Sequence, residues 1–69
     1  MKQEQLLRSW VTITHGMRGY FAIMVGKYTD GYNEYHDVIQ TGIVSYPTRE
    51  GAILEGKEWA EAEGVQFEI

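Results

Sequence analysis

The segment from Pro47 to Gly64 constrains the fold of this chain most, because it predicts one helix with both of its ends marked. Pro47 ends a strand-like segment, and Thr48 is a favourable N-cap residue. Gly64 stands where a left-handed residue ends many helices. One face of the segment, about 120° wide, gathers small residues and a tryptophan: Ala52, Ile53, Gly56, Trp59 and Ala60. We therefore expect a helix from about Arg49 to Glu63 that lies close on a sheet.

Three segments before this helix have the alternating pattern of β-strands. Residues 9–15 and 20–28 place every second side chain on the same face, and the second segment is apolar on both faces, as in a central strand. The third segment, residues 32–46, is polar over 33–37, where we expect a bulge or loop, and should pair regularly over 38–46. Glycines at positions 16 and 19 bracket the first turn, and Asp30-Gly31 predicts a type I′ hairpin turn.

The order of these elements predicts an α+β fold. We expect a three-stranded antiparallel meander with one helix packed on a face. After the helix, residues 65–69 alternate between apolar and polar, the pattern of a fourth, C-terminal strand at the sheet edge. Residues 1–69 are expected to form a single domain, in which residues 1–8 form a short helix or a frayed tail.

The net charge of −4 resides wholly in the last third of the chain. Residues 1–47 carry equal numbers of basic and acidic side chains, whereas residues 48–69 carry Arg49 and Lys57 against six glutamates. A localised acidic face repels nucleic acid and anionic lipid and attracts basic protein surfaces. We therefore expect a basic protein partner, with no direct contact to nucleic acid or to a membrane.

The small size of the chain predicts self-association. A chain this short buries only about 60% of the surface that its unfolded form exposes, so such domains usually need a disulfide, a metal or a partner. The sequence has no cysteine, which leaves a homo-oligomer or a bound partner as the source of extra stability. The first thirty residues do not resemble a signal peptide, and the expected location is cytoplasmic.

No residue pattern in the chain indicates a reaction. His15 and His36 are the two histidines, and their spacing matches no set of metal ligands. The glycines are spread through turns and caps and form no phosphate-binding loop. We expect no catalytic residue, no metal and no cofactor, and hence a protein that is not an enzyme.

Two groups of side chains are candidate partner-binding surfaces. The outer face of the expected helix carries the first group, the acidic strip: Glu50, Leu54, Glu58 and Glu61. The second group, the tyrosine hairpin, surrounds the Asp30-Gly31 turn: Tyr28, Tyr32 and Tyr35. An exposed leucine among glutamates and a cluster of tyrosines are both typical of binding surfaces. Each also has a plainer interpretation, as a solvated helix face or as cross-strand pairs that stabilise a hairpin.

Two short motifs resemble the β-β-β-α unit of HicB-like antitoxins. The motifs are Tyr28-Thr29-Asp30-Gly31-Tyr32 and Thr48-Arg49-Glu50-Gly51-Ala52. They resemble that family's Asp-Gly hairpin and its Thr-x-Glu-Glu-Ala helix entry. Gly51 replaces the second glutamate, and the family's Leu-Pro-Gly segment and DNA-binding tail are missing. In size and charge the chain also resembles small phage-encoded inhibitors of host defence, including anti-CRISPR proteins. Its order of elements is similar to a double-stranded RNA-binding domain, but that family needs a basic helix start.

These resemblances and the charge pattern lead to three functional hypotheses. The first is a small acidic, non-catalytic protein that inhibits or sequesters a basic partner, such as a nuclease or another nucleic-acid-processing protein. The second is a structural subunit that forms a homo-oligomer through its sheet edge and its tyrosines. The third is a small enzyme or ligand-binding protein whose pocket is completed at an oligomer interface, with His15 or His36 taking part.

Overall fold

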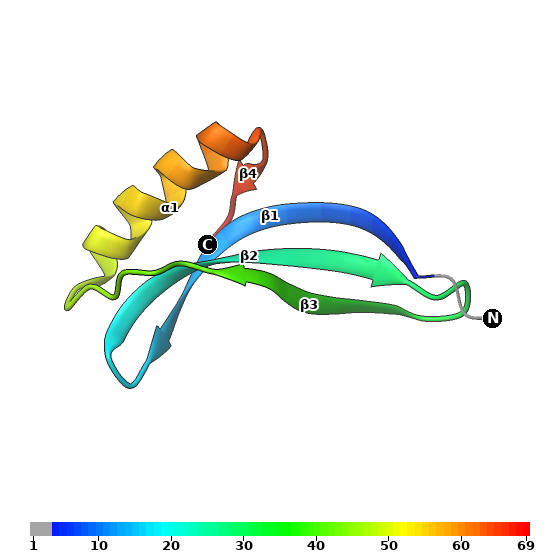
Figure 1. The fold of residues 1–69 in the computed structure, drawn as a ribbon, viewed down its shortest axis with the longest axis horizontal. Helices are drawn as coiled ribbons and strands as arrows, with labels where there is room; N and C mark the ends of the chain where they lie inside the picture. The colour runs from blue at the N-terminus through cyan, green and yellow to red at the C-terminus, as the bar shows by residue number, and fades with distance from the viewer. Residues whose placement is uncertain (1–3) are drawn as a thin grey trace.

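A computed structural model describes residues 4–69 as a four-stranded sheet with one helix packed on it (Figure 1). The elements are β1 (Gln5–Gly16), β2 (Gly19–Thr29), β3 (Glu34–Thr41), α1 (Arg49–Glu63) and β4 (Gln66–Phe67). The strand order is β3-β2-β1-β4. The first three strands pair antiparallel, and β4 pairs parallel to β1 at the edge. The predicted α+β fold and its β-β-β-α-β order are confirmed.

The predicted ends and inner face of α1 are confirmed as well. The Thr48 hydroxyl accepts a hydrogen bond from the Gly51 backbone N–H at 3.4 Å. Gly64 has φ 71°, and its N–H and that of Val65 donate to the carbonyls of Glu61 and Ala60. These bonds satisfy backbone groups that helix ends otherwise leave unpaired. The small residues of the predicted inner face are fully buried, and its two large ones are half-buried: Ala52, Gly56 and Ala60, then Ile53 and Trp59.

The core between α1 and the sheet is small. Its buried members are Val11, Ala22 and Ala60, against which four half-buried side chains pack: Met24, Trp59, Val65 and Phe67. Small side chains allow the helix backbone to lie near the strands. Added bulk at Gly56 would meet the Phe67 ring. The core therefore rests on close approach and not on bulky apolar side chains.

The strand β1 begins earlier than the sequence indicates. Residues 5–8, expected in a short helix or frayed tail, belong to β1 and pair with β2 up to Gln5↔Thr29. The register shifts between Leu6 and Arg8, which is a β-bulge at position 7. The unpaired edge of β2 supplies hydrogen-bond partners that an isolated helical turn lacks, and this favours the strand. Residues 1–3 of the expected element lie outside the described residues.

The third strand is displaced from its predicted position. Residues 34–37, expected to bulge or loop, pair regularly with β2, whereas residues 42–45, expected to pair, leave the sheet. Hydrogen bonds from Gly42 to Ala22 and between Tyr46 and Tyr20 hold the two ends of this excursion. One residue of β2 therefore lies opposite three residues of the third segment. The excess chain bulges outward before α1 begins.

The Asp30-Gly31 turn is also built differently from a type I′ turn. That turn needs positive φ at both central residues. Gly31 has φ 96°, but no residue other than glycine has positive φ in the described chain. Instead, the Asp30 carboxylate accepts hydrogen bonds from the N–H groups of Tyr32 and Asn33, at 2.9 and 2.8 Å. The hairpin loop is thus a four-residue loop stabilised by an Asp side chain.

Candidate protein-binding surfaces

The acidic strip lies on the outer face of α1, opposite the sheet. Glu50, Glu58 and Glu61 are exposed, and 63% of the Leu54 surface is accessible to solvent. Positions three and four apart on a helix are neighbours, so Glu50 and Glu58 flank the leucine and Glu61 continues the row beyond Glu58. The strip is therefore an apolar side chain within a negatively charged border.

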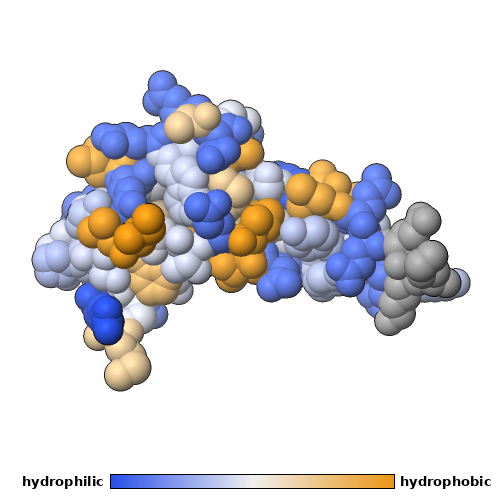
Figure 2. Space-filling view, in the orientation of Figure 1, coloured by the Kyte–Doolittle hydropathy of each residue, from blue (hydrophilic) through white to orange (hydrophobic). Residues whose placement is uncertain are grey.

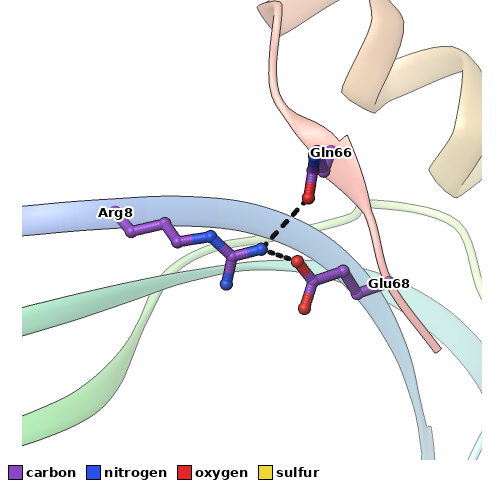
Figure 3. Close-up of polar contacts among 3 residues, drawn as sticks. All are labelled: Arg8, Gln66 and Glu68. Atoms are coloured by element: carbon purple, nitrogen blue, oxygen red, sulfur yellow. Dashed lines mark hydrogen bonds and ion pairs between the residues drawn. The ribbon is translucent and has the colours of Figure 1, made fainter.

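Ion pairs within residues 4–69 leave the strip uncompensated. Arg8 pairs with Glu68 and donates a hydrogen bond to Gln66 Oε1 at 3.2 Å, which ties β1 to the C-terminal segment (Figure 3). Lys27 pairs with Glu34 at 3.0 Å across the β2–β3 hairpin. Among the described side chains, no basic group lies within ion-pair distance of Glu50, Glu58 or Glu61. The free negative charge of the molecule is thus concentrated on α1.

The tyrosine hairpin does not form one surface. Tyr28 and Tyr35 lie opposite each other on β2 and β3, and their rings stack with centroids 5.7 Å apart. Loss of solvent around the Tyr35 hydroxyl, together with hydrogen bonding to Glu4, raises the pKa of Tyr35. Tyr32 lies apart from this pair in the loop and is 93% exposed. The stacked pair fits the interpretation of cross-strand stabilisation, and Tyr32 alone is free to contact another molecule.

The acidic strip and the tyrosine hairpin lie at opposite ends of the molecule (Figure 1). The longest axis is 43 Å, and α1 packs on β1, β2 and β4 near one end. The hairpin loop between β2 and β3 lies at the other end, beyond the reach of the helix. The structure therefore does not bring the two predicted groups into one site.

A groove beside α1 was not predicted from the sequence. It has a volume of about 350 Å³ and is lined by the segment after β3 and one flank of the helix: Gln40, Thr41, Gly42, Ile43, Val44, Glu55 and Trp59. Ile43 is 99% exposed at its rim. One sequence signal marks it, namely two adjacent large apolar residues after Gly42, where the period-two alternation fails.

The carboxylate of Glu55, which lines the groove, has one buried oxygen atom. Hydrogen bonding to the Glu55 carboxylate is the main cause that raises the pKa of Tyr46. The Oε2 atom of Glu55 is buried and has no hydrogen-bond partner among the described residues. A buried, incompletely paired carboxylate next to an indole is a favourable environment for a cationic group.

The two histidines take part in aromatic contacts on opposite faces of the sheet. His15 stacks on Tyr20 with centroids 4.4 Å apart, and His36 meets the edge of Trp10 at 5.1 Å. Neither lines the groove. Within residues 4–69, no group of three or more histidine, aspartate and glutamate side chains is placed to hold a metal ion.

Comparison with known proteins places no relative beside this chain: no family model, no curated protein and no solved structure matches it. Among residues 4–69, no helix combines the length and the apolar composition that a membrane span requires. Functional inference therefore rests on the surfaces described above.

Proposed function

We propose that this protein is a small acidic binding protein without catalytic activity. It inhibits or sequesters a basic protein partner, of the kind that handles nucleic acid, in the manner of an antitoxin or an anti-defence protein. The observation that carries the proposal is Leu54, 63% exposed between exposed glutamates that lack ion-pair partners in the described chain. Its cytoplasmic location is part of the same proposal.

The chemistry of the acidic strip suits such a partner. Carboxylates that face solvent attract lysine and arginine side chains from a distance and accelerate association. These are the groups that a nucleic-acid-binding protein uses on phosphates, so the strip would compete with the phosphate backbone. Leu54 would supply the apolar anchor that slows dissociation.

The groove extends this surface along one flank of α1. Glu55 and Trp59 line the groove, and each directly follows a strip residue in the sequence, Leu54 and Glu58 respectively. A basic side chain of the partner that reached past the strip would meet a carboxylate and an indole face. Such a cation gains both ion pairing and cation–π attraction.

A binding experiment tests the proposal. The partner is first captured from the native host and identified by mass spectrometry, and its affinity for the purified protein is then measured at several salt concentrations. Glu61→Lys should reduce the association rate, most strongly at low ionic strength. Leu54→Ala should raise the dissociation rate at every salt concentration, with a loss of about 1–3 kcal/mol if the partner buries the side chain.

Glu63→Lys is the matched control for charge. It makes the same change two residues further along α1, which points about 200° away from Glu61. The affinity of the Glu63→Lys variant for the partner should stay close to that of the wild-type protein. A partner that binds all three variants with wild-type affinity would show that the helix face is only solvated, and Tyr32 would become the leading contact.

A further inference from the structure

The sheet has a second face that no described element covers. The strand registers place side chains on it in neighbouring rows that also include the polar residues Thr14, His36 and Thr41. We call six of these side chains the open face: Trp10, Thr12, Phe21, Ile23, Val25 and Val38. Contact between the Trp10 and His36 rings confirms that β1 and β3 present these positions on the same side. The neighbouring positions, Val11 and Ala22, point the other way into the core under α1.

The centre of the open face is apolar and carries no charge. Charged side chains on this side lie at its borders: Arg8, Lys27 and Glu34 lie beyond Trp10 and Val25 along the strands, and Glu68 lies beside β1 at the β4 edge. Val38 is 50% exposed, and the other five members are half-buried by their neighbours in the sheet. Hydrophobic side chains also reach the surface in several separate patches on the view in Figure 2. The molecule thus keeps much of its apolar surface outside its own core.

The chain exposes more surface to solvent than a compact monomer of the same mass. The chain exposes 5116 Å², whereas a compact monomer of 7.9 kDa exposes about 4,400 Å². Its radius of gyration is 13.2 Å, against about 11 Å for a compact domain of this length. The excess of about 700 Å² belongs to the whole elongated molecule, of which the open face is one part, and a standard stable interface buries about 800 Å² on each partner.

We propose that the open face is the interface of a homodimer, in which a second copy of this chain packs its own open face against the first. Charge favours a second copy as the occupant. The acidic strip lies on α1, on the other side of the sheet, so face-to-face packing keeps the two negatively charged helices on the outside of the dimer. Apolar rows then meet apolar rows, as in two sheets packed about 10 Å apart.

This dimer would also bury large apolar side chains, which the small core of the monomer does not fully bury. The two open faces would bury large side chains such as Trp10 and Phe21, whereas Val11 is the largest side chain that the monomer fully buries within residues 4–69. A two-fold arrangement presents two acidic strips at once. The dimer itself does not depend on that function, so an absent partner and an absent dimer are separate results.

Sedimentation velocity of the full chain tests the interface, from micromolar to millimolar concentration. The wild-type protein should sediment as a dimer with twice the 7.9 kDa mass of the chain. Val38→Lys should weaken the dimer by about tenfold or more, because a lysine on the open face would be buried without a partner. Ile43→Lys adds the same charge at a position 99% exposed outside the open face, and it should remain dimeric.

Two results overturn the proposal: a wild-type protein that stays monomeric at all these concentrations, or a folded Val38→Lys variant that dimerises like the wild type. Circular dichroism verifies that the variants are folded. If Val38→Lys does not fold, amide chemical shifts of the wild-type protein on dilution decide the question. Shifts confined to the open-face rows of β1, β2 and β3 support the dimer, and shifts confined to α1 or to the Tyr28–Tyr35 pair contradict it.

Discussion

The two faces of the sheet differ in the size of the side chains at their centres. Under α1 the fully buried residues are Val11 and Ala22 from the strands, with Ala52 and Ala60 from the helix. On the open face, one position along the same strands, stand the larger side chains: Trp10, Phe21, Ile23 and Val25. The covered face thus fully buries only small residues, with larger ones such as Met24 and Phe67 half-buried around them, whereas the open face leaves its large side chains without a cover.

This difference shows how the chain divides its apolar side chains between two tasks. Small side chains let a single helix approach the sheet closely. Dispersion contacts between the closely packed atoms then stabilise the helix–sheet contact in place of large apolar side chains. Large side chains on the open face are half-buried in the monomer, and the part of their surface that still faces water adds nothing to its stability. Their transfer from water becomes favourable only when another surface covers them, at about 25 cal/mol per Å².

The two tryptophans give the largest expected contrast between the faces. Trp59 packs against the core under α1, so Trp59→Ala should cost about 3 kcal/mol, since its removal leaves a cavity that a helix on a rigid sheet cannot close. Trp10→Ala removes an open-face side chain that is covered in the monomer mainly by Arg8 and His36. It should lower monomer stability less and association more. Chemical denaturation under monomeric and dimeric conditions separates the two effects.

Equal losses of monomer stability in both tryptophan variants would contradict the contrast. A Trp59→Ala variant with unchanged stability would show that the helix does not depend on this contact. The side chain borders the groove as well, which makes it a useful probe of both regions.

Added volume should also have its larger effect beneath α1. Ala22 is 0% exposed beneath α1, so Ala22→Leu should destabilise the fold by about 2–3 kcal/mol because the helix must move away. Ala62→Leu adds the same atoms on an exposed helix position and should change stability by less than about 0.5 kcal/mol. Thermal melting of both variants checks the difference. Similar melting temperatures would mean that the helix–sheet contact is loose enough to accept a leucine.

Local patterns in the sequence predicted most of the fold. Thr48 and Gly64 mark the ends of α1 through backbone hydrogen bonds that their neighbours cannot replace. Alternation assigned the correct faces to the first two strands, since only one register buries Val11 beneath the helix. The parallel pairing of β4 with β1 was not predicted, because strand direction depends on where α1 returns the chain.

The misplaced third strand shows what local patterns miss. Residues 34–37 are polar, but an edge strand needs no apolar side chains to pair with β2. Residues 43–44 are apolar, yet the sheet offers them no register once Tyr46 is held opposite Tyr20. The groove follows from that excursion, so it could not be predicted either. The acidic strip, in contrast, needed only helical periodicity, and its four residues are exposed as expected.

Substitutions at two glycines test how strongly the Tyr20–Tyr46 bridge fixes the outward bulge of residues 42–45. Gly19 has φ 119°, and a Cβ atom there would clash with the Tyr46 carbonyl oxygen. Gly19→Ala should therefore cost about 2 kcal/mol through both backbone strain and displacement of residues 42–46. Gly31 has φ 96° with nothing within 4 Å of an added Cβ, so Gly31→Ala should cost about 1 kcal/mol from strain alone. Chemical denaturation measures both, and equal costs would show that the Tyr20–Tyr46 bridge adds no constraint.

The smallest expected effect lies in the hairpin loop at the end of the molecule away from α1. Backbone hydrogen bonds from Asn33 and Tyr32 hold the pKa of the Asp30 carboxyl below its usual value of 3.8. A carboxyl whose pKa is lower in the folded state binds protons more weakly there than in the unfolded chain. Its contribution to stability is therefore present above pH 3.8 and is lost as the pH falls through the lowered pKa of the folded protein.

A carboxyl-detected NMR titration of Asp30 measures this directly, and the midpoint should lie below 3.8. Acidification should speed amide exchange at Tyr32 and Asn33 before it affects α1, since the loop lies at the end of the molecule away from the helix (Figure 1). In Asp30→Asn the amide oxygen can still accept both bonds, so the loop should persist while its response to acid disappears. An Asp30 midpoint at or above 3.8 would mean that the carboxylate does not hold the loop. Exchange that begins at the loop and at α1 at the same pH would mean that the two ends of the molecule open as one unit.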